Sequence, residues 1–436
     1  MSNTVLFWHR RDLRINDNSG LFKALTSGLN VQPVFIFDKQ ILSNLAKDDQ
    51  RVAFIYQEIR RLKQQYQSLG TDLLVLYGDP THSIPDLCSK LACSHVFTNS
   101  DYEPYAFIRD NEIKIKLSSV NCALIEAKDH VIFEKSEVTK DDGLPYTIYT
   151  PYANKWRKLL TEDQLAPFES SEHTHQLRQA NEFTSLISME EMGFEAKIKT
   201  VFPSNLFPET IISNYHETRN FPALSGTSRL SIHLRFGTIS IRSLAAYALK
   251  HNATYLNELI WRDFYQMIIF HFPKTINNAF KPLYDQINWE RNEVHFQAWC
   301  EGKTGYPLVD AGMRELNETG FMHNRVRMVV ASFLTKHLLL DWRLGEAYFA
   351  EKLLDFELAS NVGGWQWAAG SGCDAAPYFR VFNPTSQQEK FDPTFSYIKK
   401  WVPEFGTSNY PKPIIEHTFA RERILARYKQ ALTSNA

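Results

Sequence analysis

Short apolar runs alternate with helical periods through residues 1–130, and this alternation constrains the fold more than any other feature of the chain. The apolar runs are Val5–Trp8, Val31–Phe37, Leu73–Tyr77, His95–Thr98 and Cys122–Ile125. Between the second and third runs, one helical stripe of apolar residues stops at Gly70; its members are Ile55, Ile59, Leu62, Tyr66 and Leu69. Alternation of this kind predicts a doubly wound parallel sheet. The segment contains neither G-x-G-x-x-G nor a P-loop, so neither of these phosphate-binding loops supports a nucleotide site here.

The sequence changes character after this segment. Residues 131–202 are polar and rich in turn residues, which is typical of a connector. From residue 203 long helical periods dominate, for example over 256–270 and 326–340. A chain of 436 residues exceeds what one core usually serves. We therefore expect an α/β domain over 1–130, a connector over 131–202 and an all-α domain over 203–436.

Composition narrows the functional classes. The net charge is −1, so no overall basicity indicates a nucleic-acid partner, although a local basic patch is compatible with it. The five cysteines are scattered without metal-ligand spacing, which predicts reduced thiols and no metal site. The N-terminus does not resemble a signal peptide, and no apolar run reaches about 18 residues. We expect a cytoplasmic protein.

Residues 361–384 combine small residues with large flat rings. Trp365 and Trp367 flank Gln366, glycines precede and follow them, and Tyr378, Phe379 and Arg380 come next. Small residues let other groups approach the backbone closely. This pattern indicates a site for a planar ring system, either a cofactor or a nucleobase.

Two further segments each allow a functional and an ordinary interpretation. Gly226–Ser231 offers hydroxyls and one cation, which suit a phosphate, but a Thr or Ser that caps a helix has the same appearance. Residues 257–265 place a carboxylate, a cation and two rings on one helix face: Glu258, Trp261, Arg262 and Tyr265. That face suits a pocket wall, and it also suits an exposed ion pair beside packed rings.

Charged residues gather in two more places. Residues 322–328 hold two Arg, a His and an Asn within a short helical segment, and Asp355 or Glu357 is a candidate partner for one Arg. A solvated helix face is the alternative. Residues 9–14 are a charged loop directly after the first expected strand, where doubly wound folds bind ligands, although such loops are usually solvated. A single Trp, considered alone, is most often part of the hydrophobic core.

Together these segments resemble the photolyase/cryptochrome family almost from end to end. The motifs stand at 10–14, 226–231, 257–262, 302–307, 322–325, 363–367 and 383–387, in the family's order and spacing. The closest branch is the class I cyclobutane pyrimidine dimer photolyases. The resemblance implies an N-terminal α/β domain with a doubly wound parallel sheet and an all-α C-terminal domain that binds FAD in a folded form.

The resemblance also implies roles for individual residues. Asn361 matches the residue that faces the flavin N5, where plant cryptochromes have Asp, and Arg327 and Asp355 match a buried ion pair beside the flavin ring. The full set of FAD-binding positions is Tyr215, Thr227, Ser228, Arg229, Leu230, Ser231, Tyr255, Arg262, Arg327, Asp355, Glu357 and Asn361.

The dimer pocket and the catalytic positions match Glu258, Trp261, Asn324, Met328, Asn361 and Trp367. The family's electron-transfer chain matches Trp365, Trp342 and Trp289. The DNA-contacting positions match Arg219, Glu258, Arg325, Arg380 and Gln387, with the Arg on backbone phosphates.

Some positions depart from the family pattern. Glu357 stands where close relatives have Asp, Val362 replaces an Asn, and Tyr255 stands where close relatives have Trp. Folate-binding relatives have Asn-Glu where this chain has Tyr105-Ala106, and Cys-Lys where it has Thr275-Ile276. These differences argue against a folate antenna of that type and leave a deazaflavin, a flavin or no antenna open.

The resemblance implies a deoxyribodipyrimidine photo-lyase, a carbon–carbon lyase in which photoexcited, reduced and anionic FAD passes an electron to a cyclobutane pyrimidine dimer flipped out of DNA. The expected partner is UV-damaged DNA, with no membrane and with a monomeric enzyme. A cryptochrome-like photoreceptor is the main alternative. We expect it less, because the sequence ends at Ala436 with no long tail after the helical domain. A (6-4) photolyase, which carries a His pair near position 324, and a nicotinamide-dependent flavoprotein oxidoreductase are the others.

Overall fold

The computed structural model describes residues 3–433, and these divide into two compact units. The sheet unit comprises the chain up to residue 134 together with 160–206 and 230–247. The helical unit comprises 135–159, 207–229 and the chain from 248 onward. This division differs from the expected boundaries, because 131–202 is split between the two units and 230–247 belongs to the sheet unit. Irregular polar segments carry no periodicity, so their packing partners were not readable from the sequence.

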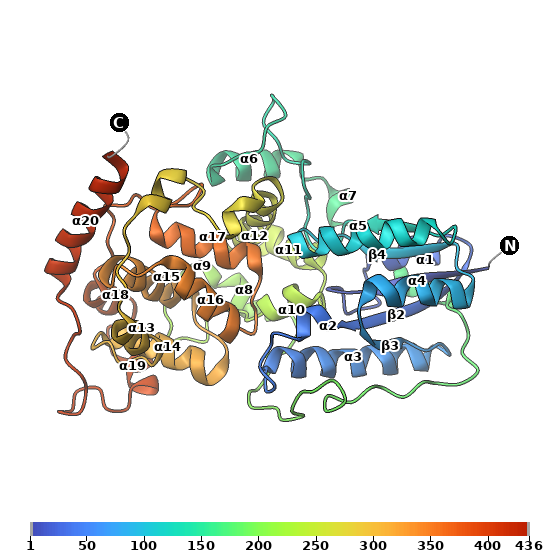
Figure 1. Cartoon of the computed structure of the whole chain (residues 1–436), viewed down its shortest axis with the longest axis horizontal. Helices are drawn as coiled ribbons and strands as arrows, with labels where there is room; N and C mark the ends of the chain where they lie inside the picture. Colours follow the sequence, from blue (N-terminus) through green and yellow to red (C-terminus); the bar gives the residue numbers. More distant parts are fainter. Residues whose placement is uncertain (1–2, 434–436) are drawn as a thin grey trace. The chain divides into compact units, whose positions relative to one another are not determined.

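The sheet unit contains five parallel strands in the order β3-β2-β1-β4-β5. Their bounds are β1 Thr4–His9, β2 Asn30–Asp38, β3 Leu74–Gly78, β4 His95–Asn99 and β5 Ala123–Ala127. The strand order reverses on either side of β1, which is the signature of a doubly wound sheet. Each strand overlaps one of the predicted apolar runs, so the predicted fold class is confirmed (Figure 1).

Alternate residues of β1 belong to different apolar clusters. Val5 and Phe7 pack in one cluster and Leu6 and Trp8 in another, as the period of two along a strand requires. The first cluster includes residues of α1 (Ser19–Leu25) and α3 (Gln50–Ser68), and the second includes residues of α4 (Pro80–Leu91) and α5 (Pro104–Ser118). Helix α3 ends just before Gly70, which has a φ of +78°, as the apolar stripe predicted.

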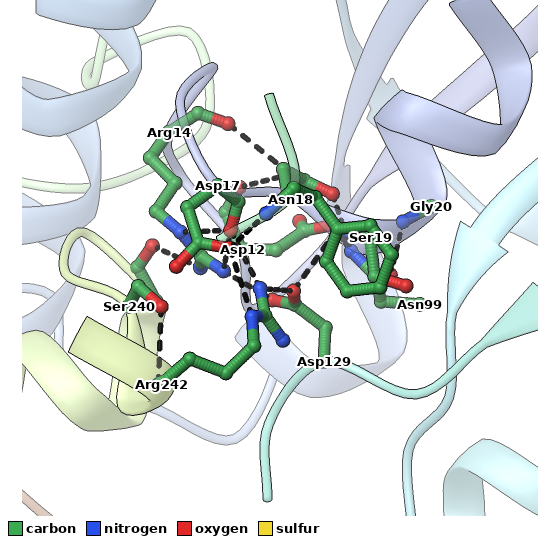
Figure 2. A network of polar contacts seen from close by, with 12 residues as sticks. Asp12, Arg14, Asp17, Asn18, Ser19, Gly20, Asn99, Asp129, Ser240 and Arg242 are labelled. Carbon is green, nitrogen blue, oxygen red and sulfur yellow. Dashed lines mark hydrogen bonds and ion pairs between the residues drawn. The ribbon is translucent and has the colours of Figure 1, made fainter. Parts of the chain in front are cut away.

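The charged loop after β1 is buried in an ionic network of the sheet unit (Figure 2). Asp129 accepts from Arg14 at 2.7 Å and from Arg242 at 2.8 Å, and Arg242 also pairs with Asp17 at 2.8 Å. Asn99 joins the network by donating to the carboxylate of Asp12. Neighbouring arginines hold the pKa of Asp129 well below its usual range, against the effect of burial. The loop is therefore neither solvated nor open here, and it ties the strand ends to residues 240–242.

The remaining elements of the sheet unit are short. They are α2 Lys39–Leu42, α7 Glu162–Leu165, η1 Ser170–Gln176 and α10 Ser231–Phe236. Helix α11 (Ile241–His251) begins in this unit and ends in the helical unit.

The helical unit is built from helices joined by turns, as predicted for the C-terminal region. Its longer helices are α6 Tyr149–Leu159, α12 Ala253–His271, α13 Glu293–Cys300, α14 Pro307–Thr319, α15 Asn324–Ser332, α16 Trp342–Lys352, α17 Leu358–Ala369, α18 Pro384–Phe391 and α20 His417–Thr433. Shorter pieces are α8 Glu209–Ser213, α9 Tyr215–Thr218, η2 Pro273–Ile276, η3 Pro282–Gln286 and α19 Ser396–Trp401. The period over 326–340 does not form one α-helix, because α15 passes into a π-helical turn, η4, over Phe333–His337.

Glycines set the close packing of α17 against its neighbours. A Cβ at Gly363 would overlap the ring of Tyr265 on α12, and a Cβ at Gly345 on α16 would overlap the ring of Trp365. Helices α14, α15, α16 and α17 share one apolar core, which includes Trp299, Trp342 and Trp365. Within residues 3–433, no helix is long and apolar enough to span a bilayer.

Candidate functional site

Helix α12 presents the predicted polar and aromatic face. It begins at Asn252, whose side chain accepts from the N–H groups of Thr254 and Tyr255 at 3.0 Å. Trp261, on this face, stacks flat on Tyr149 of α6, with 3.6 Å between the ring centres and 3° between the planes. The sequence did not indicate Tyr149, because its segment had the polar character of a connector. One face of the Trp261 ring is thus covered by the Tyr149 ring.

Glu258, one turn before Trp261, forms an ion pair with Arg219 at 2.6 Å. Both side chains are partly exposed, at 30% and 26%. Burial raises the pKa of Glu258, and the Arg219 guanidinium opposes that shift. We expected these two residues to contact different parts of the DNA, so their direct pairing is a feature that the sequence did not reveal.

Two further arginines of the helical unit pair with the acidic segment between α16 and α17. Arg327 donates to Asp355 at 2.9 and 3.1 Å, which is the predicted pair, although a quarter of the Arg327 side chain is exposed. Arg262 is buried and donates to Glu357 at 2.8 Å. The longer Glu side chain therefore keeps a charge-assisted hydrogen bond to the arginine that the family pattern places near the phosphates.

Asn361 is held by a residue that the sequence did not indicate. Its amide Nδ2 donates to the Glu346 carboxylate at 2.8 Å and to the Glu346 carbonyl at 3.0 Å. Burial raises the pKa of Glu346, and the bond from Asn361 opposes that shift. Because both donated bonds go to α16, the orientation of the Asn361 amide is set by Glu346.

The segment 226–231 does not cap a helix with a side chain. Helix α10 starts at Ser231, its cap is Leu230, and no side-chain capping bond from the described residues is present at that end. The alternative of a Thr or Ser cap was therefore wrong. Ser228 instead bonds the hydroxyl of Tyr255 at 2.8 Å, and Arg229 adopts a left-handed φ of +53° with its guanidinium 4.3 Å from the ring centre of Phe321. The boundary between the two units falls directly after Arg229.

A cavity with about 380 Å³ of empty space, counting its open mouth, lies between α12 and α17. Tyr265, Gly363 and Trp367 line it, together with the loop Gly372–Ala375. Among the described residues, the lining does not include Glu258, Trp261, Asn324 or Met328, so the cavity coincides with only part of the predicted dimer pocket.

The two tryptophans of the Trp-Gln-Trp motif have different surroundings. Gln366 fixes the helix by accepting from the Phe280 N–H at 2.9 Å and donating to the Thr275 and Asn278 carbonyls. Trp365 is buried and contacts Phe349, with 5.0 Å between ring centres, whereas Trp367 is half-buried and lines the cavity. The two rings therefore have separate environments. Of the other predicted electron carriers, Trp342 is buried and Trp289 packs partly buried beside Tyr428.

Three predicted DNA-contacting arginines lie near one another although they are far apart in the sequence. Burial lowers the pKa of Arg325, and repulsion from Arg219 and Arg380 lowers it further. Arg325 donates to Asn220 at 2.7 Å, and Arg380 is exposed, with its carbonyl accepting from buried Lys336 at 2.7 Å. Gln387 lies in the first turn of α18, after the cap residue Asn383. The grouped arginines form a local basic patch on a chain of nearly zero net charge.

Asn324 and Met328 lie on α15, with Asn324 exposed at its first turn and Met328 half-buried. His323, before them, is buried, and its Nδ1 accepts from the Arg325 N–H at 3.2 Å. Burial and nearby arginines lower the pKa of His323 to about 4. This histidine therefore acts as a neutral helix cap.

Two family models match the chain. A model described as DNA photolyase covers residues 5–172, and one described as the FAD-binding domain of DNA photolyase covers 255–408. A curated deoxyribodipyrimidine photo-lyase of Synechococcus sp. is 37% identical, over 99% of this chain and 97% of the relative. The chain belongs to the DNA photolyase family. The predicted FAD cofactor and the predicted enzyme class, a deoxyribodipyrimidine photo-lyase, are confirmed with it.

Other relatives agree on the family. The deoxyribodipyrimidine photo-lyase of Escherichia coli is 36% identical, over 98% of this chain and 99% of the relative. A class III photolyase from Agrobacterium tumefaciens has a TM-score of 0.86 and 32% identity, covering 100% and 98% of the two chains. An archaeal photolyase from Sulfolobus tokodaii, whose crystal structure holds two FAD molecules, has a TM-score of 0.84 and 34% identity, covering 98% and 100%.

The residues of the helical unit suit the FAD of this photolyase family. The loop 226–229 offers two hydroxyls and an exposed cation, which suit phosphates, and Arg262 adds a second cation. The Asn361 amide is held in one orientation by Glu346. Trp365 is buried in α17, three residues after Val362. When bound, FAD supplies the light-absorbing, electron-donating group. At two of the antenna positions, Tyr105 donates to Asp38 at 2.8 Å and Ala106 is buried.

Proposed function

We propose that this photolyase-family protein repairs cyclobutane pyrimidine dimers in DNA under blue light. The observation that carries the proposal is the gathering of Arg219, Arg325 and Arg380 beside the ion-paired Glu258. Arginines that are close together can bind successive phosphates of one strand, and these contacts hold the duplex without reading its sequence. Glu258 and the rings of Trp261 and Trp367 supply hydrogen-bonding and stacking groups suited to flipped bases.

In this proposal Asn324 and Glu258 bond the base edges, Met328 contacts the bases, and Trp261 and Trp367 wall the pocket. Asn361, held by Glu346, orients toward the flavin N5, while Arg327, Asp355, Arg262 and Glu357 hold the cofactor. When bound, reduced FAD would supply the electron for a cleavage with no net redox change. Glu258 stabilises the charge that develops on the dimer.

Repair of (6-4) products is the less favoured alternative, because His323 is buried and occupied as a helix cap. The family's cryptochrome branch is represented by a Synechocystis structure with a TM-score of 0.83 and 27% identity, covering 97% and 98% of the two chains. A cryptochrome function would require photoreduction without repair.

The test uses chemically reduced protein and UV-irradiated oligothymidine. Blue light should restore the ultraviolet absorbance of the thymine bases, and the dark sample should not change. Oligonucleotides that carry only (6-4) products serve as the substrate control. Absence of light-dependent recovery on the irradiated oligothymidine would refute the proposal.

A further inference from the structure

The buried Trp365 contacts a tryptophan outside the predicted electron-transfer chain. Trp299 of α13 lies 6.1 Å from Trp365 between ring centres, at an interplanar angle of 70°. Trp299 in turn lies 5.5 Å from Tyr348 of α16. Trp299 is fully buried, and Tyr348 is partly exposed. The three rings form a continuous aromatic series from the core to a residue that solvent reaches.

Ring pairs of this kind do not link the predicted chain among the described residues, although Trp342 and Trp365 share one apolar core. Among the described residues, no ring pair joins Trp365 with Trp342 or Trp342 with Trp289. The Arg343 guanidinium lies 4.7 Å from the ring centre of Trp342. A cation at the ring face disfavours a positive charge on the indole. Ion pairs from Arg343 to Asp285 at 2.5 Å and to Asp341 at 3.1 Å reduce this effect without removing it.

The environment of Trp299 is more favourable to the loss of an electron. Its indole N–H donates to the Val330 carbonyl at 3.3 Å, and a carbonyl dipole directed at the N–H stabilises positive charge on the ring. Trp365, by contrast, is buried, and its indole Nε1 has no hydrogen-bond partner among the described residues. The positive charge that electron loss leaves on Trp365 is therefore more stable on Trp299.

Tyr348 has the features of a terminal donor. Its hydroxyl donates to the Asn317 Oδ1 at 2.7 Å and approaches the Cys300 carbonyl at 3.2 Å. Burial raises the pKa of the Tyr348 phenol, and the Lys352 ammonium lies 5.6 Å from its ring centre. A nearby cation disfavours a charged tyrosyl, so oxidation of this ring requires release of the phenolic proton, and the partly exposed hydroxyl can release it to water.

We propose that Trp299 and Tyr348 form a second electron route to Trp365, used when oxidised FAD is photoreduced. Trp365 gives one electron to the photoexcited oxidised flavin, Trp299 gives one to Trp365, and Tyr348 gives one to Trp299. Tyr348 loses its phenolic proton to water and becomes a neutral tyrosyl. A low-molecular-weight thiol then returns one hydrogen atom to the tyrosyl oxygen. The route goes beyond the proposed repair function and rests only on the role of first electron donor that the family resemblance gives to Trp365.

The experiment measures anaerobic photoreduction of FAD-loaded protein with a thiol reductant. Trp342→Phe should retain photoreduction, and Tyr348→Phe in that background should lower the rate to that of Trp365→Phe. Phenylalanine keeps the packing of Tyr348 and removes only the hydroxyl and its oxidation. Tyr77→Phe, a half-buried position of the sheet unit, is the matched control and should have no effect.

A second readout separates an electron carrier from a structural residue. Freeze-quenched Trp342→Phe protein should give a tyrosyl signal in electron paramagnetic resonance that narrows with ring-deuterated tyrosine and disappears in Tyr348→Phe. Photoreduction of Trp342→Phe that Tyr348→Phe does not slow would overturn the route, as would a Trp342→Phe rate already equal to that of Trp365→Phe. Unimpaired photoreduction in Trp365→Phe would overturn both electron routes, because both begin at Trp365. Repair by chemically reduced protein tests the proposed function independently.

Discussion

Replacement of Glu258 with Gln should change the binding of damaged and undamaged DNA in opposite directions. The substitution keeps the shape of the side chain and removes the charge that pairs with Arg219 at 2.6 Å. Arg219 is then free for a phosphate, so undamaged DNA should bind more tightly and with a steeper dependence on salt. A dimer that bonds the carboxylate should bind less tightly, because Gln replaces a charged acceptor with a neutral one.

The expected changes in stability and in DNA affinity follow from the exposure of the Glu258–Arg219 pair and from the bonds that the carboxylate makes. Both side chains are 26–30% exposed, so loss of the pair should destabilise the fold by at most about 1 kcal/mol. Exchange of a charge-assisted bond to the base edges for a neutral one should cost about 1.5 kcal/mol in dimer binding. Preference for damaged over undamaged DNA should therefore fall by at least about tenfold, since 1.4 kcal/mol corresponds to that factor.

The assay is fluorescence anisotropy in the dark with matched duplexes, one of which carries a single dimer, at several salt concentrations. Glu290→Gln is a suitable control, because Glu290 pairs with Arg427 at 2.9 Å with similar exposures of 37% and 25%. The control should alter neither affinity. An equal change in affinity for both duplexes in Glu258→Gln, or no change in either, would refute the assigned role of the carboxylate.

Other residues give further predictions. Asp129→Asn should lower the free energy of unfolding by about 3–5 kcal/mol, measured by urea denaturation, because it removes the buried carboxylate that Arg14 and Arg242 share. Since the folded-state pKa of Asp129 is depressed, its stabilisation is present above about pH 4 and declines as the pH falls toward the folded pKa, which acid denaturation of wild type and variant should show. Glu346→Ala should speed the dark reoxidation of photoreduced flavin, followed by absorbance, in the same direction as Asn361→Ala, whereas Glu346→Gln, which keeps the acceptor, should have a smaller effect. Arg380→Gln should weaken binding to all DNA sequences alike and reduce the slope of log K against log salt by about 1.

Much of the fold was predictable because its determinants are local. The apolar runs gave the five strands, and the stripe that stops before Gly70 gave α3. Periodicity did not give the end of α15, since the apolar spacing continues through a π-helical turn. The interruption needs a change in backbone hydrogen bonding that an apolar pattern does not record.

The candidate site was predictable in its residue types and less so in its pairings. The family resemblance implied that Arg327 pairs with Asp355, and the structure has that pair. It did not reveal that Tyr149 stacks on Trp261, that Glu346 holds Asn361 or that Glu258 pairs with Arg219. Each of these contacts joins separate elements, so each depends on how the helices pack.

The sequence by itself determined the family, the sheet–helix alternation and the residue types of the site, because strand period, helix period and motif order are properties of neighbouring residues. Only the tertiary structure decided which charges pair, which rings touch and which segments share a unit. Asp129 pairs with Arg14, which lies 115 residues away in the sequence, and the ring of Trp299 on α13 contacts that of Trp365 on α17. Such contacts follow from the shapes of packed elements, and no local pattern encodes them.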